Sequence, residues 1–150
     1  MDIIEQHVFA SVHTDFTSHF QKWLSMLLDD QTLYVTLDTT LTPQIVQNGY
    51  DVTVSQLSGG EKTSVALAYR LALNRVMSDV FAAIKTKNLL ILDEPTDGFS
   101  EEQLDRVRDV LTALPTGQLI IVSHEPKVET FVDHVLRVTK ENHISIISHA

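Results

Sequence analysis

The chain has 150 residues, 43% of them hydrophobic and 21% charged, which is the composition of a folded globular domain and excludes a disordered or low-complexity segment. It has no cysteine, so disulfides and thiolate metal sites are excluded, and no apolar run longer than five residues, so a membrane span of about 20 residues is not expected. The formal net charge is −9, and residues 1–61 hold eight acidic residues against one basic residue. The sequence therefore lacks the basic stripe that is typical of a nucleic-acid-binding surface.

A long helix is predicted from Asp2 to about Leu28, followed by antiparallel strands. Apolar residues recur at every fourth position of this segment, without Gly or Pro: they are Ile4, Val8, Val12, Phe16, Phe20, Leu24 and Leu28. This spacing drifts by about 40° per step, so the helix is expected to wind around a globular body or to be the root of a coiled coil. Alternation over residues 33–37 then predicts a half-buried strand, and Asn48-Gly49 between the segments 44–47 and 50–54 predicts a hairpin.

From Gln56 onward helices and strands alternate, which predicts an α/β fold. The expected elements are helices over 58–84 and 100–114, strands over 89–92 and 119–122, a short helix over 126–132 and a strand pair over 135–139 and 144–148. Two four-residue aliphatic runs with a helix between them fit buried parallel strands joined by a crossover, and functional residues usually follow the carboxyl ends of such strands. No repeat or linker divides the sequence, so residues 1–150 are expected to form a single unit.

The segment Leu57-Ser58-Gly59-Gly60-Glu61 opens the second long helix. Ser58 is placed to cap this helix, and Glu61 three residues later completes a capping box. The two glycines leave backbone N–H groups uncovered at the positive end of the helix dipole, so the same segment can bind an anion. A simple cap is the alternative, but glycines at the first helical positions cost about 1 kcal/mol each against alanine, which argues for a function beyond stability.

Asp93 and Glu94 follow the first aliphatic run. Adjacent carboxylates at the end of a buried strand are costly unless they hold a cation or take part in proton chemistry. Strand alternation would point them to opposite sides, which suits one magnesium ligand and one base aimed at water; an acidic turn is the alternative. His124 follows the second run in the same way, where it could donate a hydrogen bond to a phosphate oxygen or be a structural histidine.

Taken in order, these three motifs resemble the signature motif, the Walker B motif and the switch histidine of the ABC-type ATPases. Residues 96–99, Thr-Asp-Gly-Phe, occupy the place of that superfamily's D-loop. Glu61 in place of Gln, the sequence Asp93-Glu94-Pro95-Thr96 and the 35 residues between Ser58 and Asp93 resemble the SMC-like chromosome and repair ATPases, in particular their double-strand-break repair branch, more than the transporters. The leading helix is similar to the returning arm of an intramolecular coiled coil.

The resemblance implies the carboxyl-terminal lobe of an ABC-type ATPase head: α/β, with parallel strands and crossover helices, a small antiparallel part and a coiled-coil root helix. The root helix is expected over residues 1–30, the antiparallel strands over 31–55 and the lobe with the four motifs over 56–150. Two departures from the family matter. Phe99-Ser100 replaces the Leu-Asp that commonly ends the D-loop, and the sequence has no Gly-x-x-x-x-Gly-Lys-[Ser/Thr] P-loop. In the family the P-loop lies in an amino-terminal half, beyond the coiled coil.

By the same resemblance, ATP and Mg²⁺ are the expected cofactors. Asp93 would hold magnesium through water, and the catalytic residues would be Glu94, which orients or deprotonates the attacking water, and His124, which senses the γ-phosphate. The nucleotide-binding residues would be Ser58, Gly59, Gly60 and Asp97. The first three of these bind the γ-phosphate of the opposite head's nucleotide, and the D-loop that contains the fourth reaches the partner head.

The implied partners are an amino-terminal half with the P-loop, a second ATPase head that dimerises through ATP, and a repair nuclease. DNA contact is expected mainly through other chains, membrane contact is not expected, and the location would be cytoplasmic or chromosome-associated, in a nucleoid or a nucleus. The alternatives are the head half of another SMC-type chromosome ATPase and a transporter-type ABC nucleotide-binding module. A transporter module is expected to have a glutamine in place of Glu61 and a basic coupling surface. A scaffold without catalysis is disfavoured by the intact Asp93-Glu94 pair.

Overall fold

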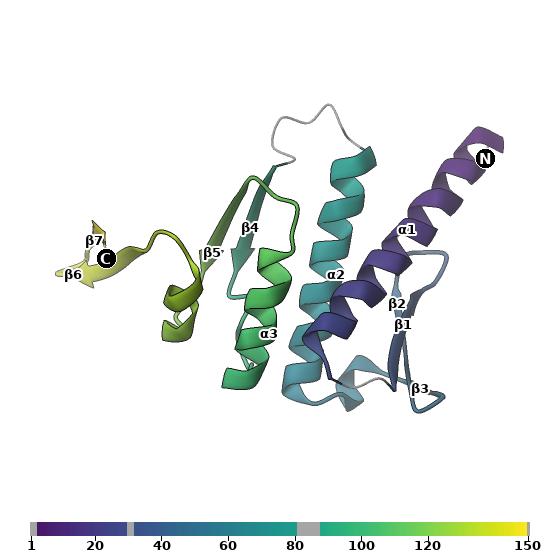
Figure 1. Cartoon of the computed structure of the whole chain (residues 1–150), viewed down its shortest axis with the longest axis horizontal. Coiled ribbons are helices and arrows are strands. Elements are labelled where there is room, and N and C mark those ends of the chain that lie inside the picture. The colour runs from purple at the N-terminus through teal and green to yellow at the C-terminus, as the bar shows by residue number, and fades with distance from the viewer. Residues whose placement is uncertain (1–2, 30–31, 81–87, 150) are drawn as a thin grey trace.

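Two long helices, α1 (Ile3–Leu27) and α2 (Gly59–Val80), pack against each other at the centre of the fold (Figure 1). The computed structural model describes residues 3–29, 32–80 and 88–149. Helix α1 confirms the helix predicted from the four-residue spacing, except at Asp2, which lies outside the described residues. Helix α2 confirms the second predicted helix as far as Val80, and its predicted extension to Ile84 lies outside the described residues. No helix in the described ranges is long and apolar enough to cross a membrane.

The second half of α1 anchors this helix to the body. Phe16 and Phe20 are fully buried, and their rings contact the ring of Tyr69 on α2 with centroid separations of 5.0 and 5.6 Å. Aromatic pairs of this kind contribute about 0.5–1.5 kcal/mol beyond the burial of their surface. In the first half, Val8 and Phe9 are exposed, and this end of the helix projects from the body (Figure 1). A buried second half and a projecting first half are the arrangement expected of a coiled-coil root.

An antiparallel sheet lies beside α1 and consists of β1 (Leu33–Leu37), β2 (Pro43–Gln47) and β3 (Tyr50–Val52). Strand β1 alternates between buried and exposed residues, which confirms the half-buried strand predicted there. Asn48 and Gly49 join β2 to β3 with φ of 53° and 81°, the left-handed backbone that a two-residue hairpin turn requires. The predicted hairpin is confirmed, although β3 ends at Val52 because a 3₁₀ turn, η1 (Val54–Gln56), follows it.

Strands β4 (Leu89–Asp93) and β5 (Gln118–Val122) pair in parallel, and helix α3 (Glu101–Thr112) connects them as predicted. The expectation that both strands are buried is wrong for one face of the pair. Leu90 and Leu92 lie in the hydrophobic core, whereas the side chains on the opposite face are exposed: Ile91 by 60%, Ile120 by 41% and Val122 by 50%. The helices of this chain cover one face of the strand pair, and the aliphatic residues of the other face remain open.

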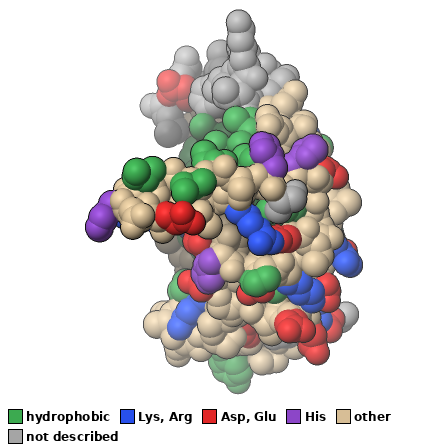
Figure 2. Space-filling view, turned by 90° about the vertical axis from the view of Figure 1, so that its left-hand side faces the viewer, with side chains coloured by type: hydrophobic (Ala, Val, Ile, Leu, Met, Phe, Trp, Pro, Cys, Tyr) green, Lys and Arg blue, Asp and Glu red, His purple; other side chains and the backbone are tan. Residues whose placement is uncertain are grey.

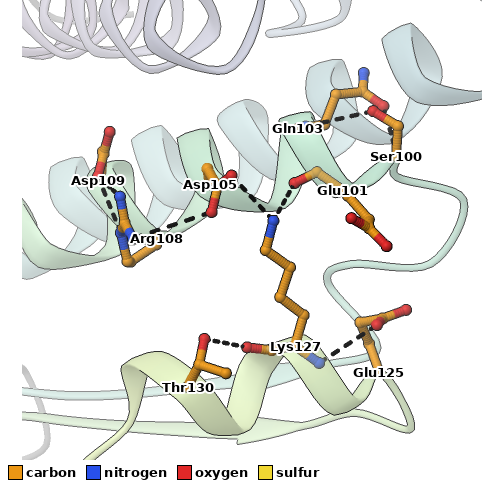
Figure 3. A network of polar contacts seen from close by, with 9 residues as sticks. All are labelled: Ser100, Glu101, Gln103, Asp105, Arg108, Asp109, Glu125, Lys127 and Thr130. Atoms are coloured by element: carbon orange, nitrogen blue, oxygen red, sulfur yellow. Dashed lines mark hydrogen bonds and ion pairs between the residues drawn. The ribbon is translucent and has the colours of Figure 1, made fainter.

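A 3₁₀ helix, η2 (Pro126–Phe131), follows β5 and packs against α3. Figure 3 shows the polar contacts between them. Lys127 donates from Nζ to the backbone carbonyl of Glu101 at 2.7 Å and to Oδ2 of Asp105 at 3.0 Å. These bonds fix the segment after β5 to the first turns of α3.

The chain ends in a hairpin of β6 (Leu136–Glu141) and β7 (Ile144–His149), which confirms the predicted strand pair. The hairpin extends away from the helices (Figure 1), and every one of its strand residues is exposed. Figure 2 shows this side of the molecule, with hydrophobic side chains on the projecting hairpin and beside it. An exposed two-stranded hairpin is marginally stable by itself, so this part of the fold is suited to pairing with another element.

Candidate functional site

The carboxyl ends of β4 and β5 bring Glu94 beside the residues that follow Val122. Asp93 pairs with Val122 in the parallel register, and one further backbone bond joins the N–H of Glu94 to the carbonyl of Val122 at 2.8 Å. Glu94 has φ of 44°, a left-handed conformation that costs a non-glycine residue about 1–3 kcal/mol. The strand therefore ends at Asp93, and this turn, rather than the strand alternation assumed from the sequence, sets the direction of Glu94.

Glu94 and His124 form a direct pair across the two strands. Nδ1 of His124 lies 2.9 Å from Oε2 of Glu94, and because a carboxylate only accepts, the ring nitrogen donates. Both side chains are open to solvent, His124 by 75% and Glu94 by 41%. The hydrogen bond to Glu94 and its negative charge raise the pKa of His124, and the charges of Asp97 and Glu125 raise it further. The two residues predicted to be catalytic are thus brought together.

Asp93 is exposed at the end of β4, on the open face of the strand pair. Its carboxylate is a suitable donor for Mg²⁺, which usually takes one or two protein carboxylates and completes its octahedral shell with water and phosphate oxygens. Among the residues that the structure describes, no three His, Asp or Glu side chains gather closely enough to hold a metal ion. The donor set of this chain therefore fits part of a magnesium shell, and other groups must complete it.

Residues 96–99 form a turn between β4 and α3 that is tied to two other parts of the fold, the segment after β5 and helix α2. Oγ1 of Thr96, which is only 4% exposed, lies 3.0 Å from Oγ of Ser123, just beyond β5. The N–H of Phe99 donates to the carbonyl of Thr96 at 3.2 Å, and Gly98 between them has φ of 79°. The carbonyl of Asp97 accepts a hydrogen bond from α2, at Oγ1 of Thr63 and 3.0 Å.

The amino-terminal end of α2 has the predicted capping box. Oγ of Ser58 accepts from the N–H of Glu61 at 3.3 Å, and the N–H of Ser58 donates to Oε2 of Glu61 at 2.7 Å. A Cβ at Gly59 would meet nothing within 4 Å, so this part of the backbone is open to a ligand. A Cβ at Gly60 would lie 2.5–2.9 Å from three side-chain atoms of Gln103, so this glycine is needed for the close approach of α3.

The described residues divide the candidate site into two groups. Glu94, His124 and Asp93 lie at the strand ends, whereas the bonds of Ser58 stay within the first turns of α2, and no hydrogen bond among the described residues joins Ser58 to Glu94 or His124. Asp97 is linked to both groups. Its charge raises the pKa of His124, and its carbonyl accepts a hydrogen bond from Thr63 on α2.

Sequence reasoning assigned no positioning role to the residues that hold these groups in place. They are Thr63, Thr96, Gln103, Ser123 and Lys127. A signal existed for one of them, because Ser100 and Gln103 have the same three-residue spacing as Ser58 and Glu61 and form a second capping box. The contacts of the others join residues far apart in sequence, and no local pattern encodes them.

Comparison with curated proteins identifies relatives of one kind. The DNA double-strand break repair Rad50 ATPase of Thermococcus kodakarensis is 37% identical over 110 residues, which is 71% of this chain and 12% of that protein. The protein of the same name from Methanosarcina acetivorans is 28% identical over 151 residues, which is 91% of this chain and 14% of that protein. The chain thus spans about an eighth of the length of the curated relatives it matches. No protein-family model matches the sequence.

Solved structures with the same fold are SMC heads. A chain from a study of ATP-driven dimerization and DNA-stimulated activation of SMC ATPases superposes with a TM-score of 0.74 at 18% identity, over 96% of this chain and 88% of that chain. The SMC head domain from Thermotoga maritima superposes with a TM-score of 0.64 at 24% identity, over 97% of this chain and 50% of that chain. The chain therefore has the fold of a lobe of an SMC head, which confirms the predicted fold class.

Within that class, the sequence relatives are Rad50 ATPases. The chain belongs to the Rad50 and SMC-like ATPases and corresponds to the carboxyl-terminal half of such a head.

Replacing Glu94 with Gln is expected to lower the pKa of His124 toward the ordinary histidine value, because the carboxylate is the largest cause of its upward shift. A histidine whose pKa is raised by folding adds stability below its unfolded pKa, and this is lost as the pH rises through the folded pKa. NMR titration of the imidazole in the parental chain and in Glu94→Gln measures the shift. An Asp97→Asn control should move the pKa less, and equal titration of Glu94→Gln and the parent would contradict the pairing.

The two glycines of α2 should respond differently to alanine. Gly59→Ala is expected to raise the free energy of unfolding by up to about 1 kcal/mol, since the methyl group meets nothing and alanine favours the helix. Gly60→Ala should not show this gain in stability, because the methyl group displaces Gln103 and breaks the 2.9 Å hydrogen bond that the N–H of Ser100 donates to Oε1 of Gln103. Urea unfolding of the two matched variants tests this, and equal stabilisation by both would show that α3 does not need the glycine.

Proposed function

We propose that this chain is the carboxyl-terminal half of an SMC-like DNA double-strand-break repair ATPase, and that it hydrolyses ATP together with an amino-terminal half that carries the P-loop. The observation that supports this most directly is the Glu94–His124 pair, 2.9 Å apart at the carboxyl ends of parallel strands, the place where α/β sheets bind their ligands. The fold covers 50% of the Thermotoga maritima SMC head domain, which is in keeping with half of a head.

The open face of β4 and β5 supports the need for a second half. Parallel strands are normally covered on both faces, yet Ile91, Ile120 and Val122 are exposed on the same side as Asp93. A groove of about 640 Å³ runs between α2 and β4 and reaches Asp93, with Met77 among its lining residues. An amino-terminal half that packs here would bury these aliphatic side chains and bring its P-loop next to the carboxylates.

In this proposal the strand-end residues act on the nucleotide of their own head. Asp93 would hold part of the magnesium shell, and the ion, when bound, would supply positive charge beside the phosphates. Glu94 orients or deprotonates the attacking water. His124, protonated to higher pH by its carboxylate neighbours, would donate a hydrogen bond toward the γ-phosphate from the ring nitrogen that does not bond Glu94.

The amino-terminal end of α2 acts on the opposite head. Ser58, Gly59 and Gly60 present a hydroxyl and uncovered N–H groups at a helix terminus, which is a site for a γ-phosphate. Asp97 in the D-loop lies close to this terminus through its bond to Thr63 and contributes to the composite site. ATP then joins two heads, and hydrolysis releases them.

The relatives' names suggest the setting of this activity. We propose that the head works with a repair nuclease on chromosomal DNA. Because the chain has a net charge of −9, most of the DNA contact would come from other chains. Helix α1 would continue into the coiled coil. Residues 1–150 would serve as one unit of the head, with the root helix, the antiparallel sheet and the motif lobe as its parts.

The chain alone is expected to show no ATP hydrolysis, and to gain magnesium-dependent hydrolysis when its amino-terminal half is added, because phosphoryl transfer needs the lysine and backbone of the P-loop. Phosphate release by each half and by the mixture tests this. Hydrolysis by the chain alone would contradict the proposal.

Ile91→Ser should weaken assembly of the two halves about tenfold, because it removes an aliphatic contact that assembly would bury. Val54→Ser changes an exposed residue outside the strand pair and should leave assembly unchanged.

In the assembled head, Glu94→Gln is expected to keep ATP binding and to slow hydrolysis by about 10²–10⁴, the usual contribution of a positioned base. The ATP-bound dimer should then persist longer. Single-turnover hydrolysis and light scattering measure the two effects. Parental hydrolysis by the variant would show that Glu94 is not the base.

Ser58→Arg separates a composite site from a simple helix cap. As a cap alone, Ser58 contributes about 0.5–2 kcal/mol of stability, and its loss should leave dimerisation of the folded head unchanged. If it completes the opposite site, the arginine side chain should block the γ-phosphate, so that ATP-dependent dimers disappear while binding to the P-loop of the same head remains. Calorimetry and light scattering on one preparation distinguish the two, and normal ATP-induced dimers would refute the role in the opposite head.

A further inference from the structure

We propose that Thr63 is a positioning residue that holds the D-loop, residues 96–99, against the first turn of the signature helix α2; this rests on the proposed function. Oγ1 of Thr63 lies 3.0 Å from the carbonyl of Asp97 and 3.2 Å from the carbonyl of Gly59, four residues before it. One hydroxyl proton thus faces two acceptors, one within α2 and one 34 residues away. A Cβ at Gly98 would come within 3.7 Å of the same hydroxyl, so the loop packs directly on it.

The other end of the D-loop is tied to the strand that carries the switch histidine. Thr96 is buried and shares a hydrogen bond of 3.0 Å with Ser123, the residue directly before His124. Oγ of Ser123 also accepts from the N–H of Glu125 at 3.1 Å, so the residues on the two sides of His124 are bonded to each other. Thr96 is therefore bonded to the short segment that contains His124.

The exit of the loop is held as well. Ser100 caps α3 through Gln103, and Lys127 donates to the carbonyl of Glu101, the first residue of α3 (Figure 3). The side chain of Gln103 also packs against Gly60. The short loop between these anchor points has little freedom, and its bond to Thr63 is the polar link from the loop to α2 that the described residues provide.

This arrangement joins the two groups of the candidate site within one head. Glu94 and His124 act on the nucleotide of their own head, whereas Ser58 and its glycines act on the other. Thr63 touches neither nucleotide, but it is bonded to Gly59 of the signature segment and to the loop that follows Glu94. Its hydroxyl therefore keeps the signature terminus and the strand ends in the relative position that the closed dimer needs.

The test compares Thr63→Val, Thr63→Ser and Thr112→Val in the head assembled from both halves. Valine has the shape of threonine without the hydroxyl, and Thr112 makes only the bond to the carbonyl four residues before it, at 2.8 Å, so it is the matched control. Thr63→Val should lower kcat and the fraction of ATP-dependent dimer by about three- to tenfold, the effect of one hydrogen bond. ATP affinity and the unfolding midpoint should match Thr112→Val, and Thr63→Ser should restore the parental values.

Ser58→Arg and the parent are measured alongside, so that the two proposals fail separately. If Thr63→Val equals Thr112→Val in kcat and dimerisation while Ser58→Arg abolishes dimers, the positioning role is wrong and the proposed function stands. If Thr63→Ser fails like valine, or if Thr63→Val loses stability and ATP affinity together, the hydroxyl link is refuted and Thr63 is a packing residue. If Ser58→Arg forms normal ATP-dependent dimers, the proposed role of the signature segment in the opposite head fails, whatever the Thr63 variants show.

Discussion

The parallel register of β4 and β5 is the constraint on which the site depends. It places Asp93 opposite Val122, and the bond from the N–H of Glu94 to the Val122 carbonyl carries the pairing one residue beyond the strand. Glu94 and His124 meet at 2.9 Å because both follow strand ends that are fixed at the same level. A slip of one residue would exchange the core and open faces of a strand, so burial of Leu90 and Leu92 also enforces the geometry of the carboxylates. The left-handed backbone at Glu94 is local strain that this pairing sustains.

Local patterns in the sequence predicted most of the fold. The four-residue spacing of α1, the Asn48-Gly49 turn and the aliphatic runs of β4 and β5 each depend on neighbours in sequence, and the structure has all of them. The capping box of Ser58 was predictable for the same reason. The open face of the strand pair was not, because an aliphatic run looks alike whether its second face is covered by this chain or by another.

The contacts that position the candidate site were beyond the sequence for a related reason. Thr63 has the pattern of an ordinary helical residue, and its bond to Asp97 depends on how α2 and the D-loop pack. Gly60 was attributed to anion binding, while the structure adds a steric reason, the approach of Gln103. Both reasons hold together, since a glycine that admits α3 also leaves its N–H uncovered. Strand alternation failed at Glu94 because the chain turns there.

The charge around the strand ends is consistent with the proposal that this lobe needs a partner half for chemistry. The charges of Glu94, Asp97 and Glu125 all raise the pKa of His124, as expected where the local potential is negative. A triphosphate approaching such a surface is repelled unless cations accompany it. Mg²⁺ and the lysine of a P-loop would reverse the sign, and the low local dielectric of a covered strand pair would then strengthen every contact. The same carboxylates that disfavour ATP on the open lobe would, in the proposed head, hold the ion and orient the water.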